Sequence, residues 1–258
     1  MSAWVLAEQS HAAIRARRWE AAVLPFGATE PHNLHLPYGT DNFEVEAIGR
    51  RACEHAYERG AAVLLLPTIP FGVNTNHLQI PGGLALSVTP STLLKLLADL
   101  VESLERQGIS KLLLLNGHGG NELKPLMREL HHRSKMFICL CDWYKLAVDA
   151  YRGIFDQPGE HADEVETSLG LALFPELVGE IPAGTGQARP TRFAAINKGW
   201  IGITRPWHLA TSDTGLGDPA GATAQKGRRL MEVLVERLGG FLHELATTPR
   251  DQNFPYGA

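Results

Sequence analysis

The sequence predicts an α/β domain built around a largely parallel sheet. Two observations support this prediction. Short apolar runs typical of buried strands alternate along the chain with longer stretches of helical periodicity. Of the 258 residues, 44% are hydrophobic and 20% are charged, which is the balance of an ordinary globular protein with a buried core. Because no repeat, low-complexity linker or change of composition divides the chain, we expect one domain over residues 1–258.

The expected elements can be placed in order along the chain. Strands are predicted over residues 21–26, 62–66, 111–115 and 136–140, where apolar runs end at turn residues. Helices are predicted over residues 42–59, 90–107, 122–133, 160–174 and 217–245. Thr89 and Pro90 form a typical helix start, and Asn121 is expected to cap the helix that follows it. Residues 179–212 lack periodicity and predict a loop with one or two short strands.

Composition excludes several classes of partner. The formal net charge of −4 and the scattered Lys and Arg residues argue against nucleic acid. The longest apolar runs are too short to span a membrane, and the N-terminus lacks the apolar region of a secretion signal. Three cysteines without metal-binding or redox spacing are typical of reduced thiols. We therefore expect a cytoplasmic protein that acts on a small molecule.

Residues 27–41 are the first candidate site. Glu30 and His32 follow the strand at 21–26 and are two apart, so an extended segment directs both side chains to one face. Asp41 follows a turn and can fold back toward them. Such carboxylate and imidazole donors suit Zn, Mn or Fe. The alternatives are a solvated loop and, for Asp41, the N-cap of the next helix.

Polar residues also follow other strands. Glu30, His32, His118 and Asp142 lie just past the carboxyl ends of apolar runs, the edge where open α/β sheets bind ligands. His118 stands between glycines, so Gly119 allows close backbone approach. The alternative for residues 116–121 is a phosphate-binding loop, although they match neither of the usual glycine patterns.

Residues 160–168 supply a third group of polar side chains. In a regular helix His161 and Glu164 share a face, whereas Glu166 points elsewhere. We expect one of the two glutamates to enter a site. The alternative is a solvated first turn, where the helix dipole favours acids.

Several motifs together resemble the creatininase (creatinine amidohydrolase) family. The resemblance rests, in order over some 200 residues, on Gly27-Ala28-Thr29-Glu30-Pro31-His32, Gly39-Thr40-Asp41, His77 with Ile80-Pro81-Gly82, Asn116-Gly117-His118-Gly119-Gly120-Asn121, His161 to Ser168, and Gly217-Asp218-Pro219 through Gly227. It implies a three-layer α/β/α sandwich, homohexamers and a two-metal centre that hydrolyses amide C–N bonds. By the same resemblance, Glu30 and His118 would bind one metal, His32 the other, and Asp41 both, with His161 as the catalytic histidine.

The chain also departs from creatininase itself. Gly120 stands where creatininase has a metal-binding glutamate, and Glu164 lies three residues after the catalytic histidine, where creatininase has no acid. We infer that Glu164 is the replacement ligand, with Glu122 and Glu166 as alternatives. Gly83 replaces a threonine found in many members. These differences argue against creatinine as substrate. In these positions the chain resembles instead a broader branch of the family, which includes deformylases.

The resulting hypothesis is a metal-dependent amidohydrolase that cleaves an amide, lactam or formamide bond, with His161 as proton shuttle and Glu164 beside it. The expected cofactors are two divalent ions. The expected substrate contacts are Asn74, Asn76, His77, Gly119, Trp143 and Tyr144, the two aromatic residues falling near the family's substrate wall. Two rivals remain open: a single-metal lactonase or isomerase for a sugar-like metabolite, and a non-catalytic oligomer with a structural metal.

Overall fold

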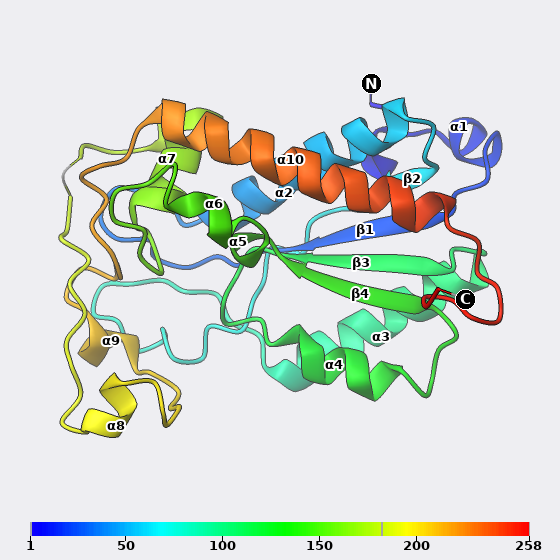
Figure 1. Ribbon diagram of the computed structural model, residues 1–258. Helices are drawn as coiled ribbons and strands as arrows, with labels where there is room; N and C mark the ends of the chain where they lie inside the picture. Colours follow the sequence, from blue (N-terminus) through cyan, green and yellow to red (C-terminus); the bar gives the residue numbers. More distant parts are fainter. Residues whose placement is uncertain (1, 182, 258) are drawn as a thin grey trace.

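Four parallel strands form the central sheet of the computed structural model, which describes residues 2–181 and 183–257 (Figure 1). They are β1 (Ala21–Phe26), β2 (Val63–Leu65), β3 (Lys111–Asn116) and β4 (Phe137–Asp142), in the spatial order β2-β1-β3-β4. Register pairs Phe26 with Asn116 and Asn116 with Asp142, so the carboxyl ends of β1, β3 and β4 are level. The four strands predicted from apolar runs are confirmed.

Helices cover both faces of this sheet, which confirms the three-layer α/β/α prediction (Figure 1). One face packs against α2 (Thr40–Glu58), α5 (Trp143–Leu146), α6 (Val148–Tyr151), α7 (Glu164–Leu173) and α10 (Ala224–Thr247). The other face packs against α3 (Pro90–Arg106) and α4 (Leu123–Leu130). Side chains of β1 alternate between the two cores: Ala21 and Val23 join the first, and Ala22, Leu24 and Phe26 the second.

Short elements complete the chain. They are η1 (Leu6–Glu8), α1 (His11–Arg15), η2 (Pro175–Leu177), α8 (Ala194–Asn197) and α9 (Trp207–Ala210). In Figure 1, α8, α9 and their loops lie beyond the carboxyl ends of the strands. The expected short strands between 179 and 212 are absent from the described part of that segment, which holds α8 and α9 instead. None of the helices in the described residues is long and apolar enough to cross a membrane.

Four helix starts differ from the prediction, and each has a local cause. Helix α10 begins at Ala224 and not at residue 217, because the Thr223 side chain caps it by accepting the Lys226 N–H. Helix α2 begins at Thr40 with Gly39 at its N-cap, so Asp41 lies in the first turn and is not the cap. Asn121 does not cap α4: its side chain accepts the Val73 N–H and donates to the Gly27 carbonyl. Helix α7 begins at Glu164, because the Asp163 side chain caps it by accepting hydrogen bonds from the N–H groups of Val165 and Glu166.

Candidate metal centre

The predicted residues at the carboxyl edge of the sheet come together as one buried cluster. Glu30 and His32 leave the loop after β1, Asp41 leaves the first turn of α2, and His118 follows β3. His161 joins them from the loop before α7. Each of the five is at most 8% exposed. The level ends of β1 and β3 explain why donors some 90 residues apart meet at this point.

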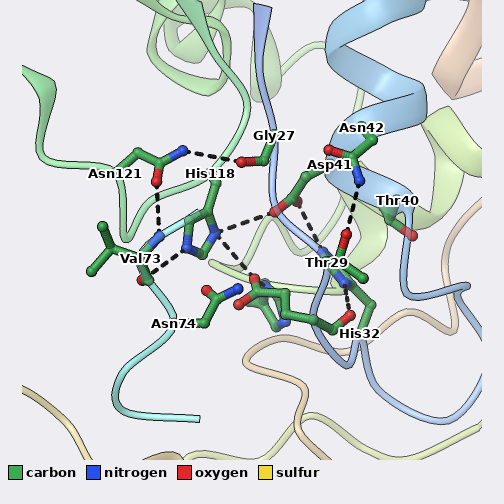
Figure 2. A network of polar contacts seen from close by, with 12 residues as sticks. Gly27, Thr29, His32, Thr40, Asp41, Asn42, Val73, Asn74, His118 and Asn121 are labelled. Carbon is green, nitrogen blue, oxygen red and sulfur yellow. Dashed lines mark hydrogen bonds and ion pairs between the residues drawn. The ribbon is translucent and has the colours of Figure 1, made fainter. Parts of the chain in front are cut away.

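Asp41 lies between two histidines. Its Oδ1 is 3.0 Å from Nε2 of His32, and its Oδ2 is 3.2 Å from Nδ1 of His118. Figure 2 shows the His118 ring pointing at this carboxylate. On its other side, His118 Nδ1 is 3.1 Å from Glu30 Oε1. One carboxylate therefore connects two neighbouring sets of donor atoms.

Each of these histidines uses one ring nitrogen to hold its orientation. His32 Nδ1–H donates to the Glu30 carbonyl at 3.0 Å, and His118 Nε2–H donates to the Val73 carbonyl at 3.3 Å (Figure 2). His161 Nε2–H donates to the Pro31 carbonyl at 3.0 Å. The second ring nitrogen of each then faces carboxylates, an arrangement typical of metal-ligating histidines.

Cations would fit this donor set. Glu30 Oε2 and Asp41 Oδ2 are buried oxygens without a hydrogen-bond partner in residues 2–181 and 183–257. A nitrogen lone pair facing a carboxylate is repulsive unless a proton or a metal ion lies between them. Within the described residues three donor groups have all their ligand atoms within 4.8 Å of one another: Glu30, His32 and His161; Glu30, Asp41 and His118; and His32, Asp41 and Glu166.

The pKa values indicate which side chains of the cluster carry a proton when no metal ion is bound. Burial opposes the charged imidazole, but the adjacent Asp41 carboxylate prevails and raises the pKa of His32 to about 10. Burial raises the pKa of Glu166 to about 8. Burial, together with the nearby His32, lowers the pKa of His161 to about 4. At neutral pH, His161 is therefore a neutral imidazole with a free Nδ1, which lies 3.8 Å from Glu30 Oε1.

Glu164 does not join this cluster, contrary to the inference that it replaces the missing glutamate. Its buried carboxylate accepts the backbone N–H groups of Asp156 and Gln157 and pairs with Lys226. The carboxylate of Glu166 lies near His32 and Asp41 instead, in one of the three donor groups. Glu122, the other alternative, is exposed and lies outside the three donor groups.

The error comes from the predicted helix start. His161 is not in a helix: it forms a bridge with Leu216, and the chain turns at Ala162, whose φ is 49°. His161 and Glu164 therefore share no helix face. A capping signal was available in the sequence, because Asp163 is followed three residues later by Glu166, whose carboxylate reaches back to the Ala162 N–H.

A cavity of about 940 Å³ opens onto the cluster and tests the predicted substrate contacts. Its lining includes Glu30, Asp41, His118, His161 and Glu166, together with the predicted contacts Asn76, His77, Gly119, Trp143 and Tyr144. Asn74 lies outside the lining: it is fully buried, and its side-chain amide donates to the Leu86 carbonyl. The prediction of direct substrate contact therefore has no support for Asn74.

Trp207 in α9 is a wall of this cavity that the sequence did not reveal. Its ring is stacked on His77 with centroids 4.6 Å apart, and it meets His161 edge-on at 4.9 Å. It belongs to the segment without periodicity, where no local pattern marks one residue over another.

The fold and this cluster define an α/β protein whose candidate metal centre lies at the carboxyl edge of a parallel sheet. The family model described as creatinine amidohydrolase matches residues 7–242. The chain belongs to this creatininase family, and it is a hydrolase by that membership.

Solved and curated relatives agree with this assignment. A crystal structure from Bacteroides fragilis, described as a candidate creatinine amidohydrolase, is 35% identical, covers 98% of this chain and 100% of its own, and superposes with a TM-score of 0.90. The 3-dehydro-scyllo-inosose hydrolase of Thermotoga maritima is 31% identical over 64% of this chain; the match spans about half, 53%, of that relative. The mycofactocin precursor peptide peptidase of Mycobacterium ulcerans is 28% identical over 84% of this chain and 82% of its own.

The structure also explains why this chain has glycine at position 120. A Cβ at Gly120 would lie 2.4 Å from His118 Nε2 and 2.5 Å from the Val73 carbonyl oxygen. A glutamate cannot be accommodated there without moving His118. A carboxylate beside His32 and Asp41 therefore comes from another element in this chain. Glu166 at the start of α7 lies there.

Proposed function

We propose that this chain is a metal-dependent amidohydrolase that cleaves an amide, lactam or formamide C–N bond of a small metabolite. The observation that carries the proposal is Asp41, whose two oxygens face His32 and His118 in two adjacent donor groups. A carboxylate shared between two such groups could hold two ions a few Å apart, which is the spacing of two-metal hydrolytic centres.

The residues that would hold the ions follow from these groups. Glu30, Asp41 and His118 would hold one ion, and His32, Asp41 and Glu166 the other, with Glu166 taking the role first given to Glu164. Zn, Mn and Fe all suit these donors. Creatininase structures that share the fold at 22% identity are described as a manganese form and a Zn–Zn form. Bound ions would supply a water of lowered pKa and polarise the scissile carbonyl.

His161 is the proton carrier in this proposal. Its Nε2–H is fixed on the Pro31 carbonyl, so the free Nδ1 faces Glu30 and the cavity. Nδ1 can take a proton near the donor groups and pass it to the leaving nitrogen, as general acid–base catalysis requires. Trp207 packs edge-on against the same ring.

The cavity and the relatives bear on the substrate. At about 940 Å³ the cavity is at the upper end of small-molecule sites, larger than a ring of creatinine's size needs. This supports the earlier inference that creatinine is not the substrate. The homohexamer implied by the resemblance and the cytoplasmic location inferred from the cysteines and the N-terminus stay predictions.

A second candidate is hydrolysis of a sugar-like metabolite, because one relative is named for the cyclic polyol ketone 3-dehydro-scyllo-inosose. One experiment separates the two candidates. Metal-loaded protein is incubated with three panels: formamides and lactams, linear amides, and lactones or cyclic polyol ketones. Turnover confined to the nitrogen compounds, and abolished by chelation, supports the amidohydrolase. Turnover confined to the oxygen compounds supports the second candidate and contradicts the first.

A further inference from the structure

His77 has a free ring nitrogen that the proposed chemistry does not use. The residue is 4% exposed and lines the cavity, and its Nε2 lies 3.2 Å from Glu30 Oε2. Neither atom has a hydrogen-bond partner among the residues that the structure describes. A buried imidazole nitrogen and a buried carboxylate oxygen therefore lie side by side at the cavity wall, both without a hydrogen-bond partner among the described residues.

The tautomer of His77 follows from its neighbour Asn76. The Asn76 side-chain amide donates to the Arg205 carbonyl at 3.0 Å, which fixes the amide nitrogen on that side. The Asn76 Oδ1 then faces His77 Nδ1 at 3.2 Å and can only accept. Nδ1 therefore carries the hydrogen, and Nε2 presents a lone pair.

Trp207 holds the ring in this position. It is stacked on His77 with an interplanar angle of 25°, and its backbone N–H donates to the Asn76 carbonyl at 3.1 Å. The Asn76 side chain and the Trp207 ring together fix both the plane and the tautomer of His77. Such support is expected where a side chain has to meet a ligand at one defined angle.

A metal ion is a less suitable occupant than a substrate group. Within the described residues His77 belongs to none of the three groups of converging donors, whereas Glu30, His118 and Glu166 each belong to at least one. Nε2 of His77 and Oε2 of Glu30 are close enough for one N–H or O–H group to reach both.

We propose that His77 is a specificity-determining residue whose Nε2, with Glu30 Oε2, accepts a hydrogen bond from an N–H or O–H group of the substrate beside its reacting carbonyl. Asn76 and Trp207 act as positioning residues for this acceptor. The inference rests on the proposed function and narrows it, because it selects primary or secondary amides and hydroxylated substrates over compounds that lack such a donor.

The test compares two probes of the same shape on the zinc-loaded protein. Acetamide carries an NH₂ group where acetone carries a methyl group. With ¹⁵N-labelled histidine, and His77→Phe to assign the signal, the His77 Nε2 resonance should be that of an unprotonated nitrogen. It should shift with acetamide and not with acetone. A protonated Nε2, equal shifts from both probes, or no shift from either would overturn the proposal.

Two variants separate the alternatives. His77→Phe keeps an aromatic ring for Trp207, so this variant should keep the full metal content. It should weaken acetamide binding about three- to tenfold, measured from the shift of the His161 ¹⁵N resonances. Loss of metal from this variant would make His77 a ligand and overturn the proposal. A His77 response to acetamide without hydrolysis of any amide would sink the proposed function alone; amide hydrolysis without that response would sink this inference alone.

Discussion

Gly120→Ala should disturb the metal centre through one added methyl group. The new Cβ would lie 2.4 Å from His118 Nε2 and 2.5 Å from the Val73 carbonyl, whereas Cβ contacts below 3.0 Å are essentially never found. The His118 ring must therefore move by at least about 0.6 Å, which is the difference between the 3.0 Å limit and the 2.4 Å contact. This movement breaks the hydrogen bond from His118 Nε2 to Val73, which is 3.3 Å long.

The size of the effect follows from two terms. Overpacking of this kind costs about 1–3 kcal/mol, and the lost hydrogen bond about 1 kcal/mol more. For a chain of this size, a loss of about 3 kcal/mol lowers Tm by about 6–12 °C. Because the bond to Val73 orients the His118 ligand nitrogen, metal affinity should fall about 10- to 100-fold.

Gly119→Ala is the matched control, because no heavy atom lies within 4 Å of a Cβ at that position. Both variants are measured by thermal denaturation of the metal-free protein and by metal titration against a competing chelator. Gly119→Ala should match wild type in both assays. If Gly120→Ala also matches wild type, the packing explanation for this glycine is refuted.

Three further predictions concern charge. Glu164→Gln should lower the free energy of unfolding in urea by about 2 kcal/mol, because it weakens the charge-assisted hydrogen bonds that the buried carboxylate accepts from the Asp156 and Gln157 N–H groups; an unchanged midpoint would contradict this. Burial lowers the pKa of His35 to about 4, so the stability it contributes is complete above pH 6.5 and is lost as pH falls toward 4. His35→Gln should flatten the stability curve in that window, and an equally steep curve would count against it. Against the effect of burial, neighbouring carboxylates raise the pKa of His32 and His118, and burial raises the pKa of Glu166 to about 8, so loading metal at pH 7 should release about three protons per chain. Calorimetry in buffers of different ionisation enthalpy measures this, and no release would contradict it.

The sequence predicted the sheet and most of the cluster for physical reasons. Apolar runs bounded by turn residues located all four strands, and parallel strands bring their carboxyl ends to one edge. Glu30, His32, Asp41 and His118 were found because they lie at or near those ends. His161 was named from the family resemblance, and the structure places it beside the same cluster.

The remaining features depend on information that periodicity does not carry. The choice between Glu164 and Glu166 depends on whether the helix begins before or after His161, and the Asp163 cap decides it. Trp207 reaches the cavity through tertiary contacts with a loop some 130 residues earlier in the chain. No local pattern encodes such a contact.

We propose that Asp41 joins two metal sites and that Glu166, not Glu164, completes the site of His32. Metal content per chain, measured by elemental analysis of wild type, Glu166→Gln and Glu164→Gln, tests it most directly. We expect about two ions in wild type, about one in Glu166→Gln and about two in folded Glu164→Gln. Loss of an ion from Glu164→Gln with both retained in Glu166→Gln would contradict it.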